Sequence, residues 1–131
     1  MQEFYENGGK VGGQFEGVPL LLLHSIGAKS GKERVNPLGY VAAEGRLFII
    51  GSNGGESNYP NWYYNLLAHP EATVEIGTET YEVRAAVLQS AERNALFAGI
   101  CEVYPVFSMY QEKAQPRVIP IIELIMKEKQ K

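Results

Sequence analysis

The sequence predicts a mainly β protein of the α+β class, in which about six strands form a closed or half-closed antiparallel barrel with two or three helices packed outside. Apolar and alternating runs of strand length follow one another mostly through short glycine-containing turns. The helix-like segments do not alternate regularly with these strands, which argues against a doubly wound parallel sheet. The 131 residues suit one domain, spanning 1–131, with a flexible glycine-rich lead at 1–17.

The strand predictions rest on apolar patterning between turn residues. Four consecutive leucines from Leu20 predict a buried strand, and a second apolar run predicts a central strand at 46–51. Strict alternation over 79–88 predicts a strand with one buried face. The predicted hairpins pair 38–43 with 46–51 through Glu44-Gly45 and 72–76 with 79–88 through Gly77-Thr78, and a last strand at 117–125 carries Pro120, which places it at an edge or a bulge.

Helix signals occur at four places. The expected segments are an amphipathic helix at 2–7, a helix at 58–69 with Ser57 or Asn58 as its N-cap, a helix at 90–103 capped by Ser90, and a short helix or tight turn at 104–110. Helical spacing directs Trp62 and Leu66 toward the core. The third helix is expected to bury a stripe of Leu96, Gly99, Ile100 and Val103.

The segment from Gly27 to Pro37 is the densest cationic run of the chain and lies between two predicted strands. Glycines at 27 and 31 permit positive φ, so consecutive backbone N–H groups can face one concavity with Lys29, Lys32 and Arg34 around it. This arrangement describes a site for an anion such as phosphate. The same residues also suit an exposed hairpin whose lysines serve solubility and edge protection, and the turn alone leaves both interpretations open.

Two further features are candidates for a site. A second glycine-rich turn, 51–55, leads into the helix at 58–69, and the free N–H groups of a helix N-terminus suit an anion or a carbonyl-rich ring. Tyr104, Phe107 and Tyr110 recur at every third residue and fall roughly on one side of a short helix. They form either an aromatic wall of a binding site or the closing layer of the core, and the spacing favours neither.

Composition excludes several classes of function. A net charge of -3 argues against broad nucleic-acid binding, which needs a basic face. The single cysteine, Cys101, rules out an internal disulfide, and with His24 and His69 far apart the sequence offers no metal-binding cluster. The absence of a charged-then-apolar leader and of a long apolar run predicts a cytoplasmic protein in a reducing compartment.

Taken together, the ordered motifs closely resemble the deazaflavin-dependent nitroreductase family over nearly the whole chain. The motifs are Gly27-x-Lys29-Ser30-Gly31-x-x-Arg34-x-Asn36-Pro37-Leu38, Ser52-x-Gly54-Gly55, Pro60-x-Trp62-Tyr63-x-Asn65-Leu66 and His69-Pro70, with further matching segments at 7–13, Tyr104-Pro105 and Ile119-Pro120. The resemblance implies a split β-barrel that binds the deazaflavin coenzyme F420. It also implies transfer of a hydride from the reduced coenzyme to a quinone, a nitroaromatic or a similar activated ring.

The resemblance also implies roles for residues at the matching positions. Lys29, Ser30, Gly31 and Arg34 would hold the phosphate and the anionic tail of the coenzyme, Asn36, Pro37 and Leu38 would line the approach to its ring, and Ser52, Asn53, Gly54, Gly55, Trp62, Tyr63, Asn65 and Leu66 would form the rest of its pocket. Gly39, Tyr104, Phe107 and Tyr110 would face the acceptor. A hydroxyl of Ser52, Tyr104 or Tyr110 would protonate the reduced acceptor, unless solvent does so.

Three positions depart from the pattern expected of the family. Ala28 stands where an arginine is common, Asn53 where a lysine is common, and Gly39 where a bulky aromatic residue is found near the substrate. Losing two cations predicts a weaker hold on the coenzyme or a preference for a shorter tail. Two other functions stay open, an FMN-binding split-barrel flavoprotein and a non-catalytic coenzyme-binding module. Peripheral membrane contact and a homodimer also stay open.

Overall fold

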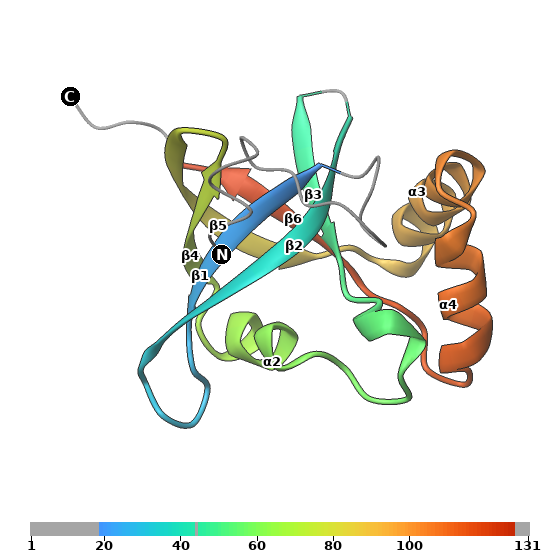
Figure 1. The fold of residues 1–131 in the computed structure, drawn as a ribbon, viewed down its shortest axis with the longest axis horizontal. Helices are drawn as coiled ribbons and strands as arrows, with labels where there is room; N and C mark the ends of the chain where they lie inside the picture. The colour runs from blue at the N-terminus through green and yellow to red at the C-terminus, as the bar shows by residue number, and fades with distance from the viewer. Residues whose placement is uncertain (1–18, 44, 128–131) are drawn as a thin grey trace.

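The computed structural model describes residues 19–43 and 45–127, in which six strands form one closed antiparallel barrel (Figure 1). The order around the barrel is β1-β2-β3-β6-β5-β4. The strands are β1 (Leu20–Ile26), β2 (Glu33–Ala43), β3 (Arg46–Ile50), β4 (Glu71–Ile76), β5 (Glu79–Val87) and β6 (Ile121–Met126). The predicted antiparallel barrel is therefore confirmed.

Side-chain alternation divides the apolar core into two clusters. Leu47 and Ile49 of β3 belong to the barrel interior, whereas Phe48 and Ile50 belong to a second cluster on the outer face. The outer cluster is covered by two helices, α3 (Ser90–Val103) and α4 (Val106–Ala114), which lie beside the barrel in Figure 1. Because both faces of β3 are buried, its sequence is a continuous apolar run.

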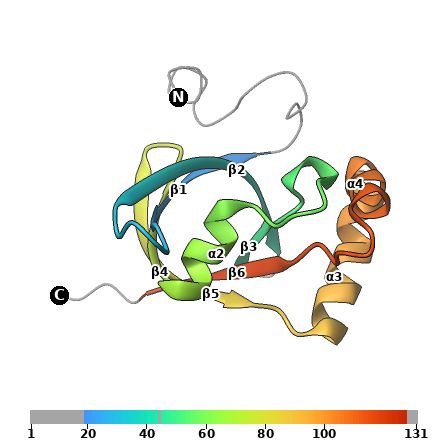
Figure 2. The ribbon, with the colours of Figure 1, turned by 90° about the horizontal axis from the view of Figure 1, so that it is seen from below.

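A third helix, α2 (Asn61–Ala68), lies across one end of the barrel (Figure 2). Trp62 and Leu66 are 5% and 4% exposed and pack into the interior cluster, as predicted. The helix begins three residues later than predicted, and its N-cap is Pro60, which makes no side-chain capping bond. Proline fixes an extended entry to the helix, so neither Ser57 nor Asn58 is needed as a cap.

The predicted stripe on α3 is partly wrong. The helix begins at Ser90 as expected, but its N-cap is Gln89, and its buried residues are Phe97 and Ile100. Val103 is 68% exposed and Gly99 is exposed as well. The reason is that the apolar contacts of α3 are made to the outer cluster, which covers only a narrow strip of the helix.

Two strand predictions also need correction. β2 begins at Glu33 rather than residue 38, so Arg34 and Pro37 belong to the strand and not to the turn. β6 begins at Ile121 and lies between β3 and β5, so it is not an edge strand. Pro120 precedes β6 and needs no N–H there, while its carbonyl accepts a hydrogen bond from Gly51 N–H (2.9 Å).

Two sequence predictions, the helix at 2–7 and the lead at 1–17, lie outside the described residues.

Across 19–43 and 45–127, the structure contains no helix with the length and apolar character needed to cross a membrane.

An ion-pair network joins the barrel to α3. Arg46 of β3 donates two hydrogen bonds to Glu123 of β6 (3.0 and 2.8 Å) and one to Glu92 of α3 (2.8 Å). The hydrogen bonds from Arg46 hold the pKa of the Glu123 carboxyl below its usual value.

We therefore expect Glu123→Gln to destabilise the fold in a pH-dependent way. A depressed folded-state pKa gives stability that is present above the unfolded-state pKa, about 4.3, and is lost as the pH falls through the folded value. The difference in Tm between wild type and variant should be largest near neutral pH and shrink in acid, as measured by calorimetry. Glu79→Gln, an exposed change on β5, is the control. A Tm difference that stays constant with pH would contradict the assignment.

Candidate functional site

The turn between β1 and β2 is held by its own backbone. Gly27 N–H donates to the Lys32 carbonyl (2.8 Å), and Gly31 N–H donates to the Gly27 carbonyl (3.0 Å). Gly31 has φ +69°, a conformation that glycine adopts without strain. Ser30 Oγ accepts a hydrogen bond from Lys32 N–H (3.2 Å) and would lie 2.5 Å from a Cβ at residue 27. The sequence of this turn therefore fixes its shape.

Helix α2 is tied directly to this turn. The Asn65 side chain is buried, and its Oδ1 accepts a hydrogen bond from Ala28 N–H (2.9 Å). Between the turn, β2 and α2 lies an open pocket of about 1300 Å³, which we call the basic pocket. Its lining residues are Gly27, Ala28, Lys29, Ser30, Glu33, Arg34, Val35, Asn36, Asn61, Tyr64, Asn65, Leu67 and Ala68.

A second pocket of about 260 Å³, the aromatic pocket, lies where the two core clusters meet. Trp62 of the interior cluster and Phe107 of the outer cluster both contribute to its wall. Its lining residues are Pro37, Leu38, Gly39, Ile50, Ser52, Asn53, Gly54, Pro60, Trp62, Val106, Phe107 and Tyr110.

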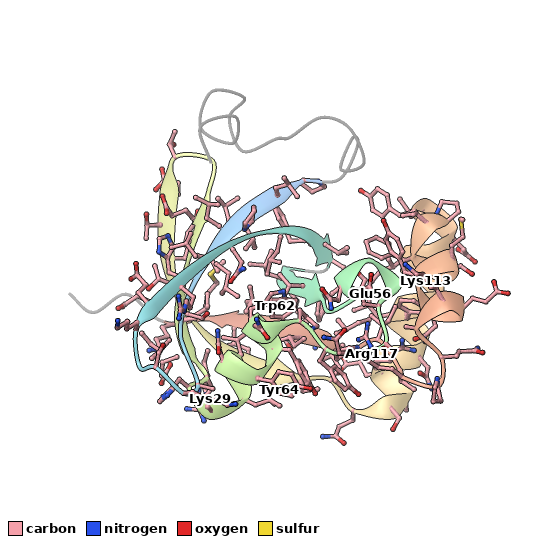
Figure 3. All side chains as sticks on the ribbon, turned by 60° about the horizontal axis from the view of Figure 1, so that its bottom comes forward. Lys29, Glu56, Trp62, Tyr64, Lys113 and Arg117 are labelled. Atoms are coloured by element: carbon pink, nitrogen blue, oxygen red, sulfur yellow. The ribbon has the colours of Figure 1, made fainter. Side chains whose placement is uncertain are left out.

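The two pockets adjoin each other along the chain. In β2, Asn36 lines the basic pocket and the next residue, Pro37, lines the aromatic pocket. At the start of α2, Pro60 lines the aromatic pocket and the next residue, Asn61, lines the basic pocket. In Figure 3, Trp62 lies between Lys29 and Tyr64 on one side and the loop that carries Glu56 on the other. A charged compartment and a mostly apolar one are thus built on two shared elements, β2 and the segment at the start of α2.

The loop after β3 forms one wall of the aromatic pocket. It contains a short 3₁₀ turn, η2 (Asn53–Gly55), in which Asn53 and both glycines have positive φ. The Asn53 side chain donates to the Asn58 carbonyl (3.1 Å). Gly55 packs on α4, where a Cβ would lie 3.0 Å from Lys113 Cδ and 3.1 Å from the Tyr110 carbonyl oxygen.

Sequence reasoning missed Arg117, which contacts this loop from the segment before β6. The Arg117 guanidinium donates to the carbonyls of Gly51, Ser52 and Glu56 at 2.8–3.1 Å. Its side chain is buried at 7% exposure, and Figure 3 shows it beside Glu56. The sequence shows only an arginine between Pro116 and Val118, and its burial, which is rare for arginine without a specific set of acceptors, becomes visible only in the structure.

The aromatic residues Tyr104, Phe107 and Tyr110 pack in the outer part of the core, and two of them also line the aromatic pocket. Tyr104, Phe107 and Tyr110 form successive edge-to-face contacts with centroid separations of 6.3 and 5.9 Å. All three belong to or pack against the outer cluster. Phe107 and Tyr110 also line the aromatic pocket, whereas Tyr104 does not.

Five of the predicted site residues line neither pocket. These are Gly31, Gly55, Tyr63, Leu66 and Tyr104. Tyr63 stacks on Tyr59 at 4.8 Å, and burial raises the pKa of its phenol. The other predicted residues divide between the pockets: Lys29, Ser30, Arg34, Asn36 and Asn65 in the basic one, and Pro37, Leu38, Gly39, Ser52, Asn53, Gly54, Trp62, Phe107 and Tyr110 in the aromatic one.

Other reactive side chains lie apart from these pockets. Cys101 is half-buried against the outer cluster, and burial raises the pKa of its thiol, so the reactive thiolate is disfavoured. In the described part of the chain, no group of three or more His, Cys, Asp and Glu side chains is placed to hold a metal ion.

Comparison with known proteins identifies the family. A family model described as F420H(2)-dependent quinone reductase matches residues 1–125. Rv3178 of Mycobacterium tuberculosis is 36% identical over 107 residues, which cover 82% of this chain and 89% of that protein. Rv1261c of the same organism, an F420H(2)-dependent quinone reductase, is 35% identical over 122 residues, with coverage of 88% and 80%.

A solved structure of an F420-H2 dependent reductase (FDR-A) superimposes with a TM-score of 0.71 at 34% identity, covering 81% of this chain and 93% of that one. The closed antiparallel barrel and its outer helices define a split-barrel protein. Within that class, the chain belongs to the F420H(2)-dependent quinone reductase family. The interpretation as a deazaflavin-dependent oxidoreductase is thus confirmed.

The packing of η2 on α4 leads to a prediction about its two glycines. We expect Gly54→Ala to lower the free energy of unfolding by about 1–2 kcal/mol, the usual cost of a left-handed residue. Gly55→Ala should cost at least about 1 kcal/mol more, because its Cβ also meets backbone and side chain of α4, whereas residue 54 faces open space. Urea unfolding measures both. Equal losses would show that contact with α4 does not constrain the loop.

Proposed function

We propose that this chain transfers a hydride from reduced coenzyme F420 to a quinone, with the anionic end of the coenzyme in the basic pocket and its ring in the aromatic pocket. The observation that carries the proposal is that the same two elements, β2 and the start of α2, contribute lining residues to both pockets. A coenzyme that joins a charged chain to a flat ring needs two such compartments. Membership of the family supplies the identity of the coenzyme.

The basic pocket fits an extended anion. Lys29 and Arg34 are exposed and contribute mobile charge, and the Ser30 side chain lies between them in sequence. Arginine binds phosphate or carboxylate oxygens in a planar fork, whereas lysine acts as a point charge. Glu33 also lines the pocket and lies 3.5 Å from His24 Nδ1, so its carboxylate has a partner of its own. We therefore assign the hold on the tail to Lys29 and Arg34.

The aromatic pocket fits one flat ring. Leu38, Trp62 and Phe107 give it apolar walls, and the loop residues 52–54 give it a polar edge. Its volume of about 260 Å³ is below the usual range for a drug-sized ligand, roughly 300–1,000 Å³, so a second ring would have to approach from its mouth. We assign the acceptor side to Gly39, Phe107 and Tyr110.

The predicted residues that line neither pocket receive supporting roles. Gly31 gives the cationic turn its left-handed residue, Gly55 allows the loop to pack on α4, and Leu66 fills the barrel interior. Tyr63 stacks on Tyr59, and Tyr104 packs against the outer cluster. These contacts act on the coenzyme through the elements that they position.

When bound, the coenzyme supplies the hydride. The chain orients the ring against the acceptor and excludes water with the walls of the aromatic pocket. Of the three hydroxyls proposed as proton donors, Ser52 and Tyr110 belong to residues that line this pocket, and Tyr104 does not. We therefore restrict the proposed protein donor to Ser52 or Tyr110, with solvent as the alternative.

Cation removal tests the placement of the coenzyme. We expect Lys29→Ala and Arg34→Ala each to weaken coenzyme binding about ten-fold or more, because each removes a charge-assisted contact. The dependence of log Kd on log salt should also become shallower, since these exposed charges are screened by ions. Fluorescence titration of the coenzyme at several salt concentrations measures both quantities.

Lys32→Ala is the matched control, because Lys32 lies on the same turn but does not line the basic pocket. It should change the affinity for the coenzyme by less than about two-fold, the size of a distant exposed charge. If all three variants bind as wild type does, the anionic tail does not lie in the basic pocket.

Wild-type protein separates the proposed function from the two alternatives. We expect binding of F420 to exceed that of FMN by about ten-fold or more, because FMN carries one phosphate and no further anionic tail to occupy the basic pocket. With reduced F420 the protein should turn over menadione, measured by loss of the reduced coenzyme, and a nitro compound tests the wider acceptor range. Tighter binding of FMN would favour a flavoprotein, and binding without turnover of any acceptor would favour a non-catalytic module.

A further inference from the structure

Arg117 is buried without a carboxylate partner in the described part of the chain. Its guanidinium donates Nη1–H to the Gly51 carbonyl (3.0 Å), Nη2–H to the Ser52 carbonyl (2.8 Å), and both Nε–H and Nη2–H to the Glu56 carbonyl (3.1 and 2.8 Å). The guanidinium also lies 4.9 Å from the centre of the Tyr59 ring. A buried charge is costly unless it is fully hydrogen-bonded, so this position is strongly selective for arginine.

The carbonyls that Arg117 binds belong to peptide groups at the edge of the aromatic pocket. The Gly51 carbonyl shares a peptide group with the Ser52 N–H, and the Ser52 carbonyl shares one with the Asn53 N–H. Ser52 and Asn53 both line the aromatic pocket. A hydrogen bond to a peptide carbonyl polarises the group and makes its N–H a stronger donor. Arg117 thus polarises two peptide groups whose N–H ends belong to residues that line the aromatic pocket.

The loop leaves those same N–H groups unused. Its backbone hydrogen bonds run from Gly55 N–H to the Ser52 carbonyl and from Glu56 N–H to the Asn53 carbonyl. Among residues 19–43 and 45–127, no acceptor is found for the N–H groups of Ser52, Asn53 and Gly54. Ser52 is right-handed (φ -67°, ψ -34°) and Asn53 is left-handed (φ +48°), a sequence of conformations that turns successive N–H groups into one concavity.

We propose that Arg117 is a positioning residue for the coenzyme ring. It holds the loop at 51–56 in the conformation that presents the N–H groups of Ser52 and Asn53 to carbonyl oxygens of the ring, and it strengthens those N–H groups as donors. This inference rests on the proposed function. Arg117 lines neither pocket. It acts through the backbone of the loop at 51–56, which forms one wall of the aromatic pocket.

Arg93 provides a matched control for a purely structural role. Its guanidinium binds the Ile119 carbonyl (2.8 Å) and Gln111 Oε1 (2.9 Å) and lies 4.2 Å from the centre of the Phe97 ring. Like Arg117, it joins the segment before β6 to the rest of the fold, but none of these partners lines either pocket. Removing the Arg93 side chain should lower the free energy of unfolding without changing the conformation of the loop at 51–56.

The test compares Arg117→Met, Arg117→Lys and Arg93→Met. Trp62 is the only tryptophan of the chain and lines the aromatic pocket, so quenching of its fluorescence by F420 reports binding at the ring. We expect Arg117→Met to weaken F420 binding about ten-fold or more, with an unchanged dependence of log Kd on log salt. Arg93→Met should stay within two-fold of wild type. Hydrogen exchange of the free protein should accelerate over 51–56 in Arg117→Met and not in Arg93→Met.

Arg117→Lys keeps the charge but lacks the planar fork with which the guanidinium reaches carbonyls on both sides, so it should fold and show an intermediate loss of affinity. It also keeps the test decisive if Arg117→Met fails to fold. If both Arg117 variants bind F420 as tightly as Arg93→Met, or if the loss of affinity is accompanied by a shallower salt dependence, the inference is overturned and the proposed function stands. If wild-type protein does not bind F420, the proposed function fails, and this inference fails with it.

Discussion

The alternation of side chains along β3 is the constraint on which the rest of the structure depends. It sends Leu47 and Ile49 into the barrel and Phe48 and Ile50 out of it, and the outer pair needs α3 and α4 as a cover. The aromatic pocket forms where the two resulting clusters meet, with Trp62 from one and Phe107 from the other. Its walls are therefore core residues. Changes that reshape the pocket also change the stability of the fold, whereas the basic pocket, whose cations are exposed, is largely free of that coupling.

The cations around the site act through different dielectric environments. Lys29 and Arg34 lie at the surface, where salt screens them, so in the proposed placement of the coenzyme they would set the salt dependence of binding. Arg117 lies inside the protein and has carbonyl dipoles as partners, so salt screens it little. The first kind of cation can be replaced at modest cost to the fold. Arg117 fixes a loop, and its replacement removes the guanidinium donor from the Gly51 and Glu56 carbonyls and leaves the Ser52 carbonyl with Gly55 N–H alone.

Local sequence patterns predicted the strands, turns and site motifs, which depend on neighbouring residues. They missed contacts between residues far apart in the chain. The leucine run, the hairpin turn at Gly77 and the order of the site motifs were sufficient to predict the barrel and most residues that line the two pockets. Arg117 was missed because its acceptors lie more than 60 residues earlier in the chain. The stripe on α3 was mispredicted for a related reason: the exposure of Val103 depends on how much of α3 the outer cluster covers, which helical periodicity does not reveal.

Ala28 and Asn53, the two positions at which the sequence analysis expected cations, each take part in a hydrogen bond that holds a loop. Ala28 uses its N–H to bind Asn65 of α2, and Asn53 uses its side chain to bind the Asn58 carbonyl. Each contact fixes a loop that lines one of the pockets. A preformed site loses less conformational entropy when a ligand binds. In the proposed placement of the coenzyme, the shape of both loops therefore depends on two buried side chains, Asn65 and Arg117.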